Sequence, residues 1–255
     1  MTNSDRAAAR AAFLDRAGWA GAEIAPLPGD ASTRQYFRLT RQGEPAMLMD
    51  APARAEAPTC PQDATPEQRA ALGYNAQARL AGSNPAAFAG LASALVERGF
   101  SAPRILASEP DQGFLLLEDL GDALYARLLP GQMHEGRLYS EAVDALAAIY
   151  RSSFADRVTL DGRDWPLLPY DGVALAAEAD LFLDWFAAQH AGLAISESAR
   201  ADWRQIWEQA FRRLDSCAPG LVLRDFHAEN LIHLPERDGH ARVGLLDFQD
   251  ALIGH

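Results

Sequence analysis

The sequence predicts an α+β fold in two parts, a strand-rich N-terminal half and a mostly helical C-terminal half. Short apolar runs bounded by turn residues fill the first half, whereas apolar residues recur at spacings of three and four through most of the second. The pattern changes near 118–121, at the sequence Glu-Asp-Leu-Gly. Because a chain of 255 residues can bury two hydrophobic cores, we expect two lobes, 1–119 and 120–255.

The N-terminal half carries the signals of five strands. Alternation at Tyr36, Phe37 and Leu39 is typical of one of them, whereas the prolines within 51–65 make that stretch a surface loop. Gly99 ends the second of two helices. The expected elements are a helix over 5–16, strands over 23–27, 35–40 and 46–50, a helix over 85–98, and strands over 103–107 and 113–118.

The C-terminal half is expected to be helical until its last part. Apolar residues at helical spacing predict helices over 122–129, 133–154, 172–189 and 196–214. Strand-like segments return at 221–223, 231–233 and 243–246. We find no internal repeat.

Composition and charge narrow the class of partner. The net charge of −12 argues against a nucleic-acid or anionic-membrane surface and favours a small-molecule partner. Cys60 and Cys217 have no metal spacing, so neither a disulfide framework nor a zinc site is expected. Charges interrupt the first residues and no run of eighteen apolar residues occurs, so we expect a soluble, cytoplasmic protein of undetermined oligomeric state.

All 23 basic residues are arginine, and the chain contains no lysine. A GC-rich genome that favours alanine and arginine accounts for most of this bias. The chemical consequence is independent of the cause: no lysine of this chain can contact a phosphate.

Three polar residues near the C-terminus form a pattern typical of phosphoryl transfer. Asp225 and Asp247 each follow a short apolar run, and Asn230 lies between them. An aspartate at the first position can orient a substrate hydroxyl, while amide and carboxylate oxygens at the other two suit magnesium. The alternative is that Asp225 and Asn230 only cap turns, as Asp and Asn often do. Rossmann and P-loop glycine motifs do not occur.

The segments 225–230 and 247–251 resemble the aminoglycoside phosphotransferase-like family, which shares the protein-kinase fold and acts on small molecules. The likeness covers nearly the whole chain and includes 29–38, 48–52, 114–122, 168–171 and 180–186. It is closest to the branch of anomeric N-acetylmuramate and N-acetylglucosamine kinases of cell-wall recycling. The resemblance implies a bilobal protein-kinase-like fold, with an N-terminal antiparallel-sheet lobe that binds the nucleotide and a helical C-terminal lobe for catalysis and substrate.

The resemblance also implies roles for particular residues. Asp225 takes the catalytic-base position, and Asn230 and Asp247 take the positions that hold Mg²⁺. His227 would brace the loop rather than transfer protons. ATP would bind under a phosphate loop and at a hinge, made of Gly29, Asp30, Ala31, Ser32, Thr33 and Arg34, and of Glu118 and Leu120. Asp171, Asp180 and Asp184 are candidates for sugar hydroxyls, with helix caps or solvated faces as the alternative.

The chain departs from the family pattern in four places. Leu223 stands where a histidine is usual, and Gln249 replaces the glycine of protein kinases, as is common in this family. The strand-three lysine is missing, near Met47 or Met49; Arg34 or Arg38 could replace it, although Arg34 could equally be a solvated turn residue. The chain also stops at His255, where family members continue, so we expect a truncated helical lobe without its C-terminal helices.

The expected function is therefore an ATP- and Mg²⁺-dependent small-molecule kinase, with the anomeric hydroxyl of an amino sugar as the leading acceptor. Another small alcohol, such as an aminoglycoside, choline or homoserine, is the alternative within enzymes. A nucleotide-binding pseudokinase that acts as an interaction module is the alternative outside them.

Overall fold

The computed structural model describes residues 3–28, 34–52, 59–130 and 135–255 of the chain. It divides into two compact units. Unit 1 comprises 1–55, 83–165 and 225–249, and unit 2 comprises 56–82, 166–224 and 250–255. Unit 1 thus takes segments from both sides of residue 120. The expected nucleotide and substrate lobes are a functional division, and they stay a prediction.

A five-stranded antiparallel sheet organises the first part of unit 1, as the sequence predicts. Its spatial order is β1-β2-β3-β5-β4. The strands are β1 (Glu23–Pro26), β2 (Gln35–Arg41), β3 (Glu44–Asp50), β4 (Ile105–Glu109) and β5 (Phe114–Leu117). β5 is buried along its whole length, which fits its unbroken apolar sequence Phe-Leu-Leu-Leu.

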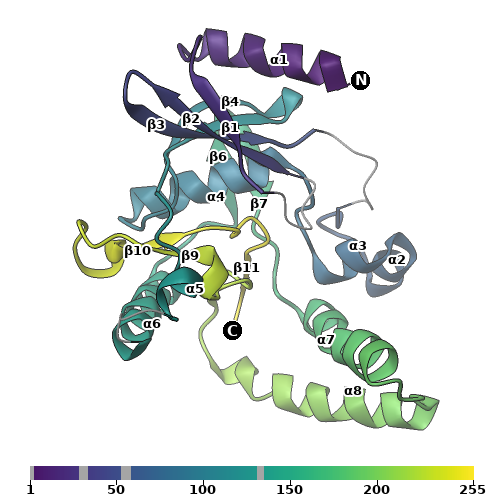
Figure 1. The fold of residues 1–255 in the computed structure, drawn as a ribbon. Helices are drawn as coiled ribbons and strands as arrows, with labels where there is room; N and C mark the ends of the chain where they lie inside the picture. Colours follow the sequence, from purple (N-terminus) through teal and green to yellow (C-terminus); the bar gives the residue numbers. More distant parts are fainter. Residues whose placement is uncertain (1–2, 29–33, 53–58, 131–134) are drawn as a thin grey trace. The chain divides into compact units, whose positions relative to one another are not determined.

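Two helices cover this sheet, one on each face (Figure 1). Helix α1 (Asn3–Arg16) buries Phe13 and Leu14 against Leu39, Leu48 and Phe114. The Phe13 and Phe114 rings stack at 5.4 Å. Neighbouring residues of a strand point to opposite faces of the sheet. The face that points away from α1 packs against α4 (Pro85–Glu97), which contacts β4 and β5. Both helices confirm the predicted ranges.

The remaining described residues of unit 1 include two further α-helices and two hairpins. Helix α5 is a single turn, shorter than the predicted 122–129, and α6 falls within the predicted 133–154. A hairpin at 157–166 was not predicted, although Asp161 and Gly162 both have positive φ, as the two central residues of a tight hairpin turn require. These elements are α5 (Tyr125–Leu128), α6 (Glu135–Arg151), β6 (Arg157–Leu160), β7 (Arg163–Pro166), β9 (Leu231–His233) and β10 (Val243–Leu245).

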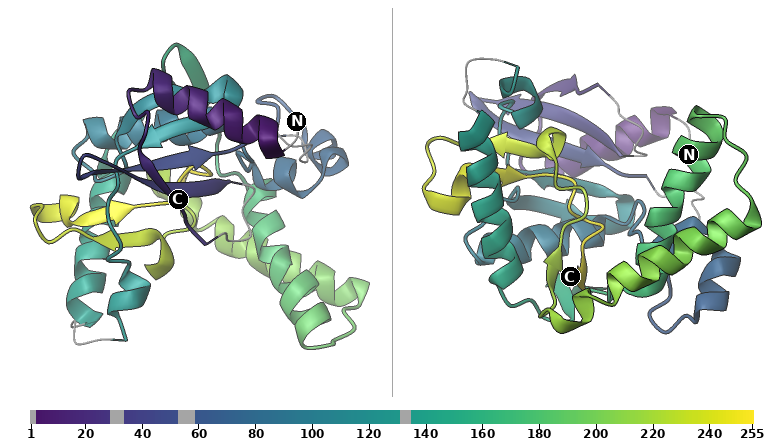
Figure 2. Two further views of the ribbon diagram at one scale, coloured as in Figure 1. Left: turned by 45° about the horizontal axis from the view of Figure 1, so that its top comes forward. Right: turned by 90° about the horizontal axis from the view of Figure 1, so that it is seen from below.

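Unit 2 is mainly helical. Its elements are α2 (Pro66–Leu72), α3 (Tyr74–Ala78), α7 (Gly172–Leu181), a π-helix that continues α7 (Phe182–His190), α8 (Glu197–Phe211), and the antiparallel pair β8 (Gly220–Val222) and β11 (Leu252–Gly254). Helices α7 and α8 lie side by side (Figure 2). The sequence predicted α7 and α8, but it did not predict α2, α3 or β11. No helix in the described ranges is long and apolar enough to cross a membrane.

Candidate active site

The β9–β10 hairpin of unit 1 brings together the two residues predicted to hold a metal. Its register pairs Leu231 with Leu245, and the Leu246 N–H continues the pairing by donating to the Asn230 carbonyl at 2.9 Å. Asn230 precedes β9 and Asp247 follows β10, so both leave the same end of the hairpin. The antiparallel register therefore makes neighbours of residues that are far apart in the sequence.

The loop that carries Asp225 is tied to Asn230. The Asn230 Nδ2 atom donates to the Asp225 carbonyl at 3.0 Å and lies 3.2 Å from His227 Nε2. The His227 N–H donates to the same carbonyl at 3.2 Å. Because the amide nitrogen of Asn230 binds the loop, its amide oxygen is the atom suited to a metal. The His227 side chain thus contacts Asn230 and links the two ends of the loop.

The Asp247 carboxylate has a neutral partner and a charged one. Gln249 Nε2 donates to its Oδ1 atom at 3.0 Å, and Arg34 Nη2 lies 3.1 Å from the same oxygen. The Asp247 side chain is 44% exposed, whereas that of Arg34 is only 12% exposed. The buried Gln249 thus orients the carboxylate, which gives a role to the residue that stands in place of a glycine.

Two residues at the candidate site have an unusual, left-handed backbone conformation. Arg224, which directly precedes Asp225, has φ of 69°, and Asp247 has φ of 53°. Residues other than glycine rarely adopt this left-handed region, and where they do, the strain often marks a functional position.

The donor set at the hairpin end fits magnesium better than zinc. One amide and one carboxylate supply oxygen only, and Mg²⁺ commonly uses one or two protein oxygens and completes its shell with water and nucleotide phosphates. Among the described residues, no group of three or more His, Cys, Asp or Glu side chains could hold a metal by itself.

The predicted hinge residues follow strand β5. The Glu118 N–H donates to the Arg104 carbonyl at 2.9 Å, and its carboxylate contacts Arg104 and Arg237, the latter at 2.8 Å. Leu120 is buried. The side chain of Glu118 is therefore engaged by arginines, and only its main chain could serve an adenine. The loop residues Gly29, Asp30, Ala31, Ser32 and Thr33 lie outside the described residues.

The two arginines considered as lysine replacements have different surroundings. Arg38 lies opposite Met47 in the β2–β3 register, and its guanidinium binds Asp122 at 2.5 Å and Asp119 at 2.6 Å. The hydrogen bonds that Arg38 donates to Asp122 and then to Asp119 raise the pKa of Arg38, and the contact with Arg38 lowers the pKa of Asp122. Arg34 lies instead against Asp247.

The three carboxylates proposed for sugar hydroxyls lie in unit 2, and each has an arginine partner. Asp180 contacts Arg204 at 3.0 Å, and Asp184 contacts Arg200 at 2.5 Å. An open pocket of about 800 Å³ has both Asp171 and Asp180 among its lining residues, but not Asp184. The structure thus places two of the three on one pocket of this unit.

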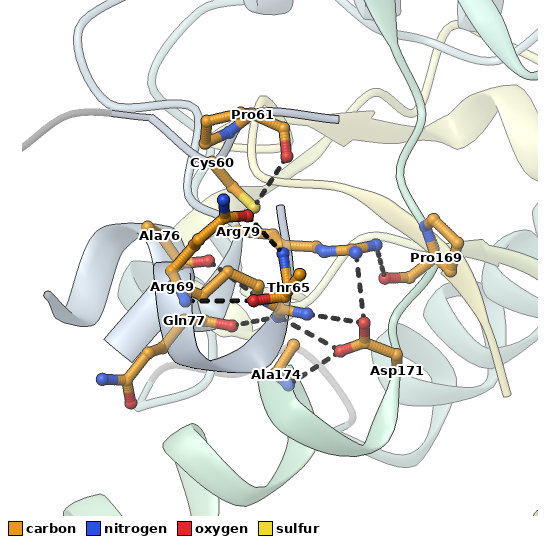
Figure 3. A network of polar contacts seen from close by, with 11 residues as sticks. Cys60, Pro61, Thr65, Arg69, Ala76, Gln77, Arg79, Pro169, Asp171 and Ala174 are labelled. Carbon is orange, nitrogen blue, oxygen red and sulfur yellow. Dashed lines mark hydrogen bonds and ion pairs between the residues drawn. The ribbon is translucent and has the colours of Figure 1, made fainter. Parts of the chain in front are cut away.

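Asp171 belongs to a network of buried arginines that sequence reasoning missed (Figure 3). It accepts from the Ala174 N–H at 3.0 Å, which caps α7, and it pairs with Arg69 at 2.6 Å and Arg79 at 3.1 Å. Although partial burial alone would raise it, the pKa of Asp171 is lowered by hydrogen bonds from Arg69 and Ala174 and by the charge of Arg79. The capping alternative is thus what the structure shows for this residue.

Arg224, which directly precedes Asp225, has its partners within unit 2. It donates to the Ala78 carbonyl at 3.0 Å, forms an ion pair with Glu178, and lies over the Tyr170 ring.

The sequence signal for α2 in this unit was Thr65 with Gln68 three residues later, since the two form a reciprocal capping box at its start.

The chain is similar in sequence to curated kinases. The chain is 46% identical over 253 residues to an N-acetylmuramate/N-acetylglucosamine kinase of Caulobacter vibrioides, a match that covers 99% of this chain and 69% of that relative. It is 34% identical to a kinase of the same name from Pseudomonas aeruginosa, covering 91% of this chain and 56% of the relative. The chain thus spans little more than half to about two thirds of the length of these relatives.

Solved structures show the same fold. The streptomycin-ATP ternary complex of the phosphotransferase APH(2")-IIa matches with a TM-score of 0.56 at 15% identity, covering 100% of this chain and 73% of that one. Aminoglycoside phosphotransferase APH(4)-Ia matches with a TM-score of 0.53 at 11% identity, covering 99% and 74%. The predicted α+β, kinase-like fold is therefore confirmed. Because the sequence model of the phosphotransferase enzyme family matches residues 23–255, the chain belongs to that family.

Proposed function

We propose that this chain is an ATP- and Mg²⁺-dependent kinase that phosphorylates the anomeric hydroxyl of N-acetylmuramate or N-acetylglucosamine. The family membership and the names of the relatives from Caulobacter and Pseudomonas support the amino-sugar acceptor. The observation that carries the chemistry is the hairpin register, which makes neighbours of Asn230 and Asp247 and ties the Asp225 loop to Asn230. ATP is made in the cytoplasm, which is where we place the reaction.

In this proposal the Asp225 carboxylate accepts a hydrogen bond from the acceptor hydroxyl and orients its oxygen for attack on the terminal phosphate. Asn230, through its amide oxygen, and Asp247 hold Mg²⁺, which when bound neutralises charge on the phosphates. Gln249 and Arg34 keep the Asp247 carboxylate in place until then. The backbone of 29–34 binds the phosphates, and the main chain at Glu118 and Leu120 binds adenine.

For the acceptor we propose that Asp171, Asp180 and Asp184 bind sugar hydroxyls. Asp180 is the best suited, because it lines the pocket of about 800 Å³ and carries a single arginine partner. Asp171 is the least suited, since it binds two arginines and a helix N-terminus. The alternative acceptors, such as an aminoglycoside, choline or homoserine, are distinguished from amino sugars by the experiment that follows.

The test follows ADP release with ATP, Mg²⁺ and a panel of N-acetylmuramate, N-acetylglucosamine, an aminoglycoside, choline and homoserine. We expect turnover with the amino sugars and a product whose reducing end is blocked, detected as a sugar 1-phosphate by phosphorus NMR. Asp225→Ala should lower kcat about a thousandfold, while Asp156→Asn, an exposed aspartate outside the site, should not.

Other results would contradict the proposal. Turnover with only a non-sugar acceptor would replace the substrate class, and phosphate on another hydroxyl would overturn the anomeric assignment. Nucleotide binding without turnover on any acceptor, unchanged in the Asp225→Ala variant, would favour a pseudokinase.

A further inference from the structure

A kinase of this fold needs a cation for the nucleotide phosphates, and this chain has no lysine to provide it. At the strand-three positions where a lysine would stand, the structure has apolar side chains. Met49 is fully buried, and Met47 lies between Arg38 on β2 and Leu117 on β5. If a long basic side chain of this chain contacts the nucleotide phosphates, it is therefore an arginine.

Arg38 is excluded by its partners. Two carboxylates, Asp119 and Asp122, bind its guanidinium from both sides at 2.5–2.6 Å. A phosphate would have to displace both of them, and Asp119 also holds the Gly121 N–H at 2.8 Å, so it is part of the local backbone structure. Arg38 therefore has a structural role at the end of β5.

Arg34 has the burial and the position that the role requires. It directly precedes β2, and its side chain is 12% exposed, far less than that of an exposed arginine such as Arg104 at 65%. Its Nη2 atom lies 3.1 Å from Asp247 Oδ1, the carboxylate assigned to magnesium. A cation in contact with Asp247 is close to the place where a metal held by that carboxylate would meet the phosphates.

We infer that Arg34 is the phosphate-binding cation of this chain and that it exchanges its contact with Asp247 for one with a phosphate when the nucleotide binds. The inference rests on the proposed function in so far as the ligand is a nucleotide phosphate. While it contacts Asp247, Arg34 neutralises the carboxylate and competes with the metal for that carboxylate. When the Mg²⁺ nucleotide binds, Asp247 holds the metal, and the planar guanidinium turns to the phosphate oxygens, which it can grip with two parallel hydrogen bonds.

This exchange predicts effects of opposite sign for the two ligands. Removal of Arg34 should weaken nucleotide binding, because a charge-assisted contact to phosphate is lost. The same removal should strengthen binding of the metal alone, because Asp247 is then relieved of a competing cation. A purely structural arginine would not produce that pair of changes.

The experiment uses the full chain and variants Arg34→Ala, Arg34→Lys and, as control, Arg41→Ala at the exposed far end of the same strand. Binding of a fluorescent ADP analogue is titrated with Mg²⁺ present, and binding of Mn²⁺ without nucleotide is followed by electron paramagnetic resonance. We expect Arg34→Ala to raise the nucleotide Kd at least about tenfold, Arg34→Lys to restore part of it, and Arg41→Ala to leave it unchanged. Mn²⁺ should bind Arg34→Ala more tightly than the unmodified chain.

An unchanged nucleotide Kd in Arg34→Ala would overturn the inference, and so would Mn²⁺ binding that is equal or weaker. Circular dichroism checks the fold of each variant, and if Arg34→Ala does not fold, Arg34→Gln gives the same comparison. Failure of the proposed function is distinguishable, because it would show as no acceptor-dependent ADP release by the unmodified chain, whereas failure of this inference leaves that turnover intact and the Arg34→Ala variant unchanged in binding.

Discussion

Two aspartates that the sequence pointed to, Asp247 in unit 1 and Asp171 in unit 2, differ in how their charge is balanced. Asp247 has one arginine at 3.1 Å, one amide, and a side chain that is 44% exposed. Asp171 has two largely buried arginines and caps a helix. A metal can displace the single arginine of the first but not the network of the second. We therefore expect the partners of an aspartate, more than its residue type, to decide whether it can bind a metal or only stabilises the fold.

The largest expected effect tests the reactive side of this comparison. Asp247→Asn, which keeps the acceptor for Gln249, should lower kcat by about a thousandfold, on the order expected for loss of a preorganised charge at the transferring phosphate. Its free energy of unfolding should change by less than about 1 kcal/mol, because the carboxylate is exposed and its ion pair is partly solvated. Steady-state kinetics and urea unfolding of the same preparation measure both. A variant that loses several kcal/mol would place Asp247 with the stabilising aspartates.

The stabilising side is tested by Arg69→Ala. Arg69 is almost fully buried and donates to the Ala76 carbonyl and both Asp171 oxygens. Its removal should lower the free energy of unfolding by about 3–5 kcal/mol, since it leaves buried acceptors without their donor. Arg204→Ala, which removes an exposed partner of Asp180, is the control and should cost under about 1 kcal/mol. Similar losses in the two variants would contradict the comparison.

Ionisation of Asp171 should contribute to the pH dependence of the free energy of unfolding. Its folded pKa lies below its unfolded value, so it contributes stability above the unfolded pKa, about 3.9, that is lost as pH falls through the folded pKa. The difference in unfolding free energy between the unmodified chain and Asp171→Asn should therefore be largest near neutral pH and shrink below about pH 4. Urea unfolding at several pH values measures it. A difference that is constant with pH would mean that the Asp171 charge is not what stabilises the network.

The smallest effect concerns the helix that carries Arg69. Thr65→Ala removes the side chain that caps α2 and should cost about 1 kcal/mol. Thr65→Ser keeps the hydroxyl and should cost much less, so thermal unfolding of the two variants isolates the cap. Equal losses would assign the effect to the lost methyl group rather than to the hydrogen bond.

The sequence predicted the elements whose signals are local. Alternation at Tyr36, Phe37 and Leu39 located β2, and the apolar run at 114–117 located β5. Two local signals were overlooked: the capping box at Thr65 and the Asp161-Gly162 turn. Contacts across the chain were beyond reach. The pairing of Leu231 with Leu245 depends on strand register, and that of Arg34 with Asp247 spans 213 positions, so neither follows from local preference.

The left-handed backbone at Asp247 has a consequence for protein engineering. Glycine would adopt φ of 53° at this position without the steric cost that an aspartate bears. A screen that selects only for resistance to heat or protease should therefore enrich Asp247→Gly, although that variant lacks the carboxylate. Selection for durability alone would therefore remove from this position the carboxylate that we assign to the metal.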